Sequence, residues 1–207
     1  MRLKSRSLMR YFVVLLTCLS LTALLLPMKA SMQQQQFPRS YDEFIIRAYQ
    51  GAYGRSPTCI ERQNEYNRLV NAAANGTLLA EARRFVATLF MTQSSYDDPT
   101  LFNYLQTSEY QARNPQDMND LAHLQAFVTD LYRAFLQREP DSAGLNFWVS
   151  NAQQEGRKKV IRAFEESIEF GDLVSQLFDG GAPVCCIRRT CPRYTYFDFE
   201  TCSCQPL

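Results

Sequence analysis

Apolar residues recur every three or four positions along most of this chain, from Tyr41 to about Phe178. This spacing places them on one face of an α-helix, whereas strand-like alternation is nearly absent from the same stretch. The clearest run is Leu124, Phe127, Val128, Leu131 and Phe135. The pattern therefore predicts a mainly α fold for this region.

Turn-forming residues interrupt the helical pattern and divide it into about seven predicted helices joined by short turns. The breaks fall at Ser56-Pro57, Asn75-Gly76, Asp98-Pro99, Asn114-Pro115, Glu139-Pro140 and Gly156. We expect Pro57 and Pro140 in the first turns of helices, where a missing N–H costs nothing. Ser56 is then expected to cap the helix that Pro57 opens.

An internal repeat appears when these two prolines are superposed. A shift of 83 positions pairs, without a gap, Phe44 with Phe127, Tyr49 with Tyr132, Arg55 with Arg138, and Pro57 with Pro140. A shift of 74 then pairs Val86, Phe90 and Tyr96 with Val160, Phe164 and Phe170. The prediction is two related multi-helix units in tandem, a degenerate one over 41–116 and a second over 117–179, stacked to bury faces that neither covers alone.

The N-terminal segment has the layout of a secretory signal peptide. Basic residues without an acid precede Tyr11, an apolar run extends to Leu26, and a small residue, Ala30, follows. The run is shorter than the roughly 20 residues needed to cross a bilayer. We therefore expect residues 1–30 to be cleaved and 31–40, with four successive glutamines, to form a polar spacer. An uncleaved membrane anchor is the alternative.

The charge balance argues against nucleic-acid binding. The full chain carries a net charge of +1, and loss of residues 1–30 removes five basic residues and no acid, which leaves −4. Capture of a phosphate backbone needs clustered Lys and Arg, and no nucleic-acid motif is present. The partner is expected to be a protein or a glycan.

The helical pattern stops at Gly180-Gly181-Ala182-Pro183, and residues 180–207 form a small cysteine-rich tail. Six cysteines remain after cleavage: Cys59, Cys185, Cys186, Cys191, Cys202 and Cys204. An even number in an exported chain predicts disulfides, although six cysteines allow 15 pairings. If all six pair, Cys59 links the tail to the helical part. Thiolate metal binding is the rival interpretation, but the two-residue spacing typical of zinc sites is missing.

Aromatic residues lie between the tail cysteines at positions that alternate between two faces, as in a short strand. They are Tyr194, Tyr196, Phe197 and Phe199. If one face is exposed, these rings could stack on a sugar or contact a protein; packing onto the helices is the alternative.

The segment 127–170 resembles the bacterial domain of unknown function 4214. The resemblance rests on a helix ending in Leu-Tyr, an Arg-x-Pro-Asp turn, a Gly-Leu and Trp helix, and a last helix with Ser-x-Glu-Phe. The matching residues are Leu131, Tyr132, Arg138, Pro140, Asp141, Gly144, Leu145, Trp148, Gly156, Ser167, Glu169 and Phe170. A degenerate copy would cover 41–96, where Glu61 and Glu65 replace Gly144 and Trp148.

This resemblance implies a fold like that of phycobilisome linker domains and an accessory module of secreted or surface proteins, without an enzymatic activity. The residues agree with a structural role for most of the motif. Leu145 and Trp148 share a helical face and are expected in the core, with Gly144 allowing close approach of a neighbour. Arg138 either ties helix ends together through carbonyls or Glu169, or faces a partner.

Residues able to support catalysis do not form a recognisable set. The one histidine, His123, has no evident partner in the sequence, and Asp97-Asp98 and Glu165-Glu166 are typical of solvated charge. Phosphate loops, dinucleotide motifs and calcium loops are missing as well. The sequence therefore predicts no enzyme, no cofactor and no metal.

Together these features predict a secreted, periplasmic or cell-surface helical module, held by disulfides, that acts without catalysis at the cell surface or in the extracellular matrix. A ligand or metal carrier built on the cysteine tail is the alternative function. Contact with a membrane is expected only if the signal segment stays uncleaved.

Overall fold

The computed structural model describes residues 40–100, 104–182, 193–198 and 203–206, and it is mainly helical, as predicted. The helices are α2 (Tyr41–Tyr53), α3 (Cys59–Ala74), α4 (Leu78–Phe90), α5 (Gln93–Asp97), α6 (Ser108–Arg113), α7 (Leu121–Leu131), η2 (Tyr132–Leu136), α8 (Ser142–Glu155), α9 (Arg157–Glu165) and α10 (Ile168–Ser175). The segment η2 is a π-helical continuation of α7. The predicted signal segment lies outside the described residues.

Every predicted break separates two helices, but two further interruptions were missed. Thr92 begins α5 and Ser167 begins α10, each by accepting a hydrogen bond from a backbone N–H of the first turn. Hydroxyl caps of this kind end one helix and start the next without Gly or Pro. The count of about seven helices was too low for that reason.

The expected positions of the prolines within their turns were wrong by two residues. Helix α3 begins at Cys59 with Thr58 as its cap, and Thr58 and Glu61 form a reciprocal capping box, so Ser56 is not the cap. Asp141 caps α8 in the same way, by accepting from the Gly144 N–H at 2.8 Å. Pro57 and Pro140 therefore precede the caps, where their fixed φ sets the entry of the chain into each helix.

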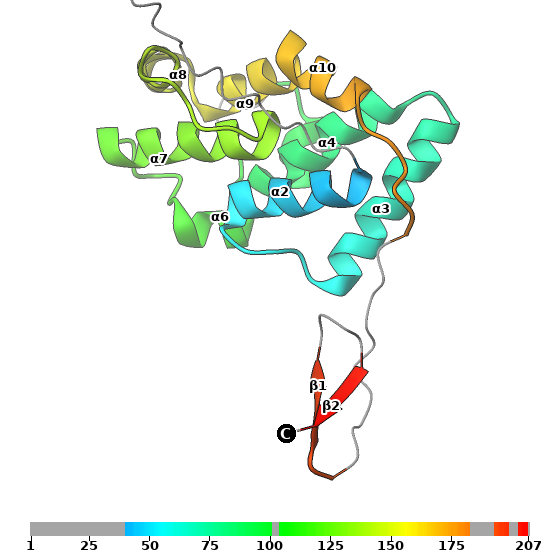
Figure 1. The fold of residues 1–207 in the computed structure, drawn as a ribbon. Helices are drawn as coiled ribbons and strands as arrows, with labels where there is room; N and C mark the ends of the chain where they lie inside the picture. Colours follow the sequence, from blue (N-terminus) through cyan, green and yellow to red (C-terminus); the bar gives the residue numbers. More distant parts are fainter. Residues whose placement is uncertain (1–39, 101–103, 183–192, 199–202, 207) are drawn as a thin grey trace, which may run out of the picture. The chain divides into compact units, whose positions relative to one another are not determined.

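Helix α2 occupies the middle of the helical part, with α3 on one side and α7 with η2 on the other (Figure 1). Helix α4 also contacts α2 and supports α9 and α10. Aromatic side chains from both predicted units meet in one hydrophobic cluster. The Phe90 and Phe135 rings stack with centroids 6.1 Å apart, and Phe44 lies 6.4 Å from Phe170. The helices of both predicted units thus share a single core.

The described part of the tail is a two-stranded antiparallel hairpin. Strand β1 (Thr195–Asp198) pairs with β2 (Ser203–Pro206), with Thr195 opposite Pro206 and Phe197 opposite Cys204. Strand β1 overlaps the stretch where alternation predicted a strand. Tyr194 precedes it with a positive φ of 67° and an exposed side chain.

Among the described residues, none of the helices combines the length and the apolar character that crossing a bilayer requires.

Candidate binding cleft

A cleft in the helical part has a volume of about 1080 Å³. The chain between α5 and α7 forms one wall, and the junction of α8 with α9 forms the other. Most lining side chains are uncharged amides and hydroxyls. The full lining is Thr92, Tyr104, Leu105, Gln106, Ser108, Gln111, Gln116, Asp117, Asn119, Ala152, Gln153, Gly156 and Arg157. Such a surface offers many donors and acceptors with little net charge.

Backbone pairing holds the first wall against the end of α4. The Thr92 N–H donates to the Leu105 carbonyl at 2.8 Å, and Met91 and Gln106 form an isolated antiparallel bridge. Thr107, the cap of α6, donates from its hydroxyl to the Leu89 carbonyl at 2.9 Å. These bonds therefore hold residues 105–107 of the first wall against α4.

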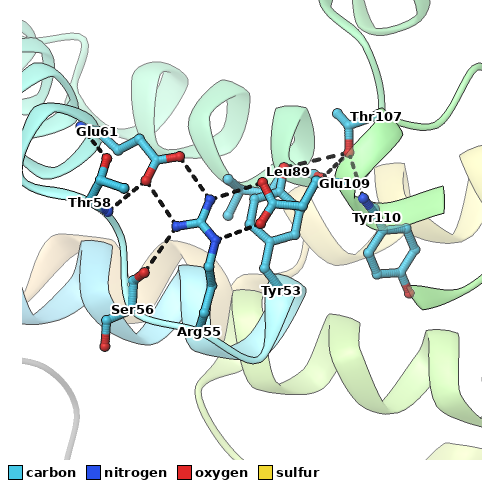
Figure 2. A network of polar contacts seen from close by, with 9 residues as sticks. All are labelled: Tyr53, Arg55, Ser56, Thr58, Glu61, Leu89, Thr107, Glu109 and Tyr110. Carbon is cyan, nitrogen blue, oxygen red and sulfur yellow. Dashed lines mark hydrogen bonds and ion pairs between the residues drawn. The ribbon is translucent and has the colours of Figure 1, made fainter. Parts of the chain in front are cut away.

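Arg55 fixes the same wall from the other side (Figure 2). Its Nε donates to Glu109 Oε1 at 2.6 Å and its Nη2 to Glu109 Oε2 at 2.9 Å, so the pair is bidentate. The same guanidinium donates to both carboxylate oxygens of Glu61 at 2.9 Å. Its hydrogen bonds lower the pKa of Glu61 to about 2, against a smaller opposing effect of burial. Arg55 thereby links α2, α3 and the first turn of α6.

Two of the cleft's lining residues, Gln106 and Arg157, are almost fully buried yet incompletely hydrogen-bonded. Gln106 is 8% exposed and donates from Nε2 to the Tyr104 hydroxyl at 3.0 Å, while its Oε1 has no partner among the described residues. Arg157 is 4% exposed, and its Nε likewise has none there. Buried polar groups are normally paired, so both atoms need an explanation.

Burial strongly affects a phenol that lines the cleft, Tyr104, and an acid behind it, Asp130. Burial raises the pKa of Tyr104 to about 12 and that of Asp130 to about 6. Asp130 accepts from the Tyr110 hydroxyl at 3.2 Å and from Arg113 at 3.4 Å, which oppose the effect of burial without overcoming it. Because Asp130 lies behind α6 and does not line the cleft, it supports the wall.

Arg138 lies against Glu169, one of the two arrangements that the sequence allowed. Its Nε and Nη2 donate to the two oxygens of Glu169 at 2.6 and 2.9 Å, and its guanidinium lies 4.7 Å from the centre of the Tyr132 ring. A fork of this kind joins the turn before α8 to the first turn of α10. Pro140 and Asp141 shape that turn.

The other motif residues surround the same aromatic core. Trp148 is half-buried, with its ring 5.1 Å from Phe164, and Leu145 packs beside it. At Gly144 a Cβ would come within 2.3 Å of the Tyr132 hydroxyl oxygen, so the neighbour that approaches Gly144 is a side chain and not a helix. Phe170 is completely buried.

The candidate binding aromatics of the tail are only partly described. Tyr194 is exposed, Tyr196 and Phe197 lie on β1 at positions where the structure describes the backbone alone, and Phe199 lies outside the described residues. Cys204 is on β2, whereas Cys185, Cys186, Cys191 and Cys202 are outside the described residues. Within the described ranges, His, Cys, Asp and Glu form no group able to hold a metal ion.

Two sequence-based expectations about titratable residues were wrong. His123 does have a partner, because its Nδ1 lies 2.6 Å from Asp120 Oδ2 within the first turn of α7. Glu165 is not a solvated acid: it is 3% exposed, accepts from Arg162 at 2.6 Å, and has a pKa raised by burial. Tertiary packing buries Glu165 against α4, which adjacent charges in a sequence do not reveal.

Sequence reasoning missed the cleft entirely. Its walls come from segments far apart in the chain, and its amides belong to turns that carry no motif. One signal was present: Gly156 precedes Arg157, Lys158 and Lys159, which places basic residues where a helix start favours acids. That inversion points to an unusual helix N-terminus.

The fold and the cleft show that the described part of this molecule is a helical module with a mainly uncharged polar cleft. Residues 103–174 match the family model of a domain of unknown function (DUF4214), which includes the 127–170 segment where the resemblance was noted. Comparison with curated proteins and with solved structures found no match.

Proposed function

We propose that this protein is a secreted, non-catalytic helical module that contacts glycans or proteins at the cell surface or in the extracellular matrix. The cleft between α6 and the junction of α8 with α9 carries this proposal. Binding sites typically combine apolar surface with a few placed polar groups, and this cleft has both. Amide and hydroxyl side chains both donate and accept, which suits the hydroxyl groups of a saccharide.

The state of Cys59 supports an oxidising compartment. Cys59, the first residue of α3, is disulfide-bonded. Disulfides are typical of exported proteins and rare in reducing compartments. This agrees with the signal-peptide layout of residues 1–30 and with a tail held by the remaining cysteines.

We also propose that the two units arose by duplication and share one arrangement of helices, like that of phycobilisome linker domains. The shift of 83 that pairs Tyr49 with Tyr132 also relates Gly51 to Ala134, and these two residues touch. Self-contact of equivalent residues is what a pseudo-two-fold axis requires. Each unit also places an arginine over its tyrosine, at 5.4 Å in the first unit and 4.7 Å in the second.

The first unit departs from the family pattern at Glu61, and this residue takes part in the same kind of arginine–carboxylate contact. Glu61, at the position of Gly144, supplies Arg55 with a carboxylate. In the second unit the carboxylate comes from Glu169 on α10. In the first unit the local Glu61 and the distant Glu109 both bond the arginine, so the degenerate copy retains the tie.

Export is tested first by intact mass of the protein recovered from its native host, before and after reduction and alkylation. We expect a mass beginning at Ser31 and a gain of six alkyl groups only after reduction. A full-length mass with free thiols would contradict export and favour the carrier function.

Binding is tested with oligosaccharides prepared from the host's extracellular matrix and immobilised on a sensor surface. Gln153→Trp fills the cleft from an exposed position on α8 and should reduce binding about tenfold or more. Gln154→Trp, one residue further and outside the cleft, is the matched control and should bind like the wild type. Equal binding by both variants would show that the cleft is not the contact surface.

A further inference from the structure

Arg157 is the one buried arginine among the described residues, and it has no carboxylate partner there. Its Nη1 donates to Asn114 Oδ1 at 3.2 Å and its Nη2 to the Met118 carbonyl at 2.6 Å. Its guanidinium lies 5.1 Å from the centre of the Phe127 ring. All these partners are neutral, and the buried Nε has no partner among the described residues.

Three partly buried arginines of the described residues are arranged differently. Arg55, Arg138 and Arg162 each bond at least one carboxylate oxygen at 2.6 Å. Burying a charge without an opposite charge is costly, because water that would solvate it is removed. An anion bound next to Arg157 would therefore lower the cost of burying its charge.

The start of α9 adds further positive potential to the cleft. Arg157 is the first residue of this nine-residue helix, whose N-cap is Gly156, so no side chain caps its free N–H groups. The first turn contains no acid, although acids are favoured there. Lys158 donates to the Asp98 carbonyl and Lys159 pairs with Glu155, so both ammonium groups are already engaged. Arg157 alone brings a positive side chain into the cleft.

Gln106 requires a hydrogen-bond donor from the ligand, whereas Arg157 requires an acceptor. Its buried Oε1 is an acceptor that needs a donor, which a simple anion cannot provide. A ligand that satisfies both residues carries an anionic group and a hydroxyl. The volume of about 1080 Å³ exceeds a single ion by far and suits a saccharide of more than one ring.

We propose that this cleft binds a carboxylate-bearing saccharide, with its carboxylate beside Arg157 and a hydroxyl group beside Gln106. The inference rests on the proposed glycan contact and specifies the class of glycan. Two of the five guanidinium N–H groups of Arg157 have partners, and an edge of the guanidinium matches the two oxygens of a carboxylate.

Asp117 provides a way to test this charge preference. It lines the cleft, is exposed, and would repel a bound carboxylate. Asp117→Asn should therefore strengthen binding of an acidic saccharide by about threefold, without changing the binding of a neutral one. Asp172→Asn removes the same charge from an exposed position on α10, outside the cleft, and should change neither.

The experiment is isothermal titration of the exported chain with tetragalacturonate and with its methyl ester, which has the same sugar rings without the charges. We expect the acid to bind about tenfold more tightly than the ester, and the difference to shrink in high salt. Gln106→Glu, which places a carboxylate in the site itself, should weaken binding of the acid.

Equal affinity for the acid and the ester would overturn the carboxylate assignment while leaving the proposed glycan contact intact. Acid binding that Asp117→Asn leaves unchanged would place the ligand elsewhere on the molecule. If neither saccharide binds, the saccharide class itself is wrong, and this outcome is independent of whether the chain is exported. Because Asp117 is exposed, its variant should fold, and circular dichroism verifies this.

Discussion

Gly51 of α2 lies directly against the backbone of Ala134 in η2. A Cβ at Gly51 would come within 2.4 Å of the Ala134 nitrogen, so only glycine permits this approach. The contact joins the two predicted units at the middle of the shared core.

We expect Gly51→Ala to lower the free energy of unfolding by about 3 kcal/mol, because neither backbone can move without disturbing the core. Thermal denaturation followed by circular dichroism measures this. Gly171→Ala is the control, since a Cβ there meets nothing within 4 Å and Gly171 lies within α10. It should stabilise the protein by about 0.5 kcal/mol, and equal effects of the two variants would contradict the close contact.

The Arg138 tie is expected to matter more than an exposed ion pair of similar geometry. Arg138→Ala removes a bidentate, partly buried pair and should cost about 1–3 kcal/mol. Arg133→Ala removes the more exposed pair with Glu139 and should cost less than about 0.5 kcal/mol. Urea denaturation of both variants measures the difference. If the two variants lose the same stability, Arg138 has no special structural role.

Arg55 should behave like Arg138 if the two units share one plan. Arg55→Ala releases Glu61 and Glu109 together and is expected to cost about 1–3 kcal/mol. It should also loosen the start of α6, which hydrogen exchange of the amides in α6 would detect. Unchanged exchange would mean that the Thr107 contacts hold α6 by themselves.

Asp130 gives the protein a pH dependence of known sign. Its pKa is about 6 in the folded state and 3.8 as the reference for the unfolded chain, so between these values the folded state binds more protons. Stability contributed by this group is therefore greatest below about pH 4 and is lost as the pH rises to about 6, by at most about 3 kcal/mol.

The measurement compares unfolding free energies of the wild type and Asp130→Asn from pH 4 to pH 8. The difference isolates Asp130 from Arg113, Tyr110, Arg133 and Glu139, which face it, and from other acids such as Glu61. The variant should lose the decrease between pH 4 and pH 6. Parallel curves would mean that Asp130 titrates normally in the folded state.

Gly144 and Tyr132 should show coupled effects. Gly144→Ala drives a Cβ against the Tyr132 hydroxyl oxygen and is expected to cost about 1–2 kcal/mol. In a Tyr132→Phe background the clashing oxygen is gone, so the same change should be nearly neutral. A double-mutant cycle measures the interaction energy, and additive effects would sink the idea that this oxygen explains the glycine.

The periodicity of apolar residues determined the helices from Tyr41 to Phe178 and, with Gly and Pro, most of their ends. Local rules suffice there because an amphipathic face and a turn residue act over a few positions. For Arg138 the sequence left carbonyls, Glu169 and a partner open as contacts, and the structure shows the bond to Glu169.

Only the tertiary structure decided the cleft. Gln106 and Arg157 line the same cleft because α4 holds the wall before α6 while α9 starts on the opposite side, and no local pattern records that arrangement. Burial likewise made Asp130 and Glu165 interior acids, because desolvation depends on which helices cover a side chain. The sequence by itself determined where helices form, whereas packing between distant segments decided which polar groups were left to bind something else.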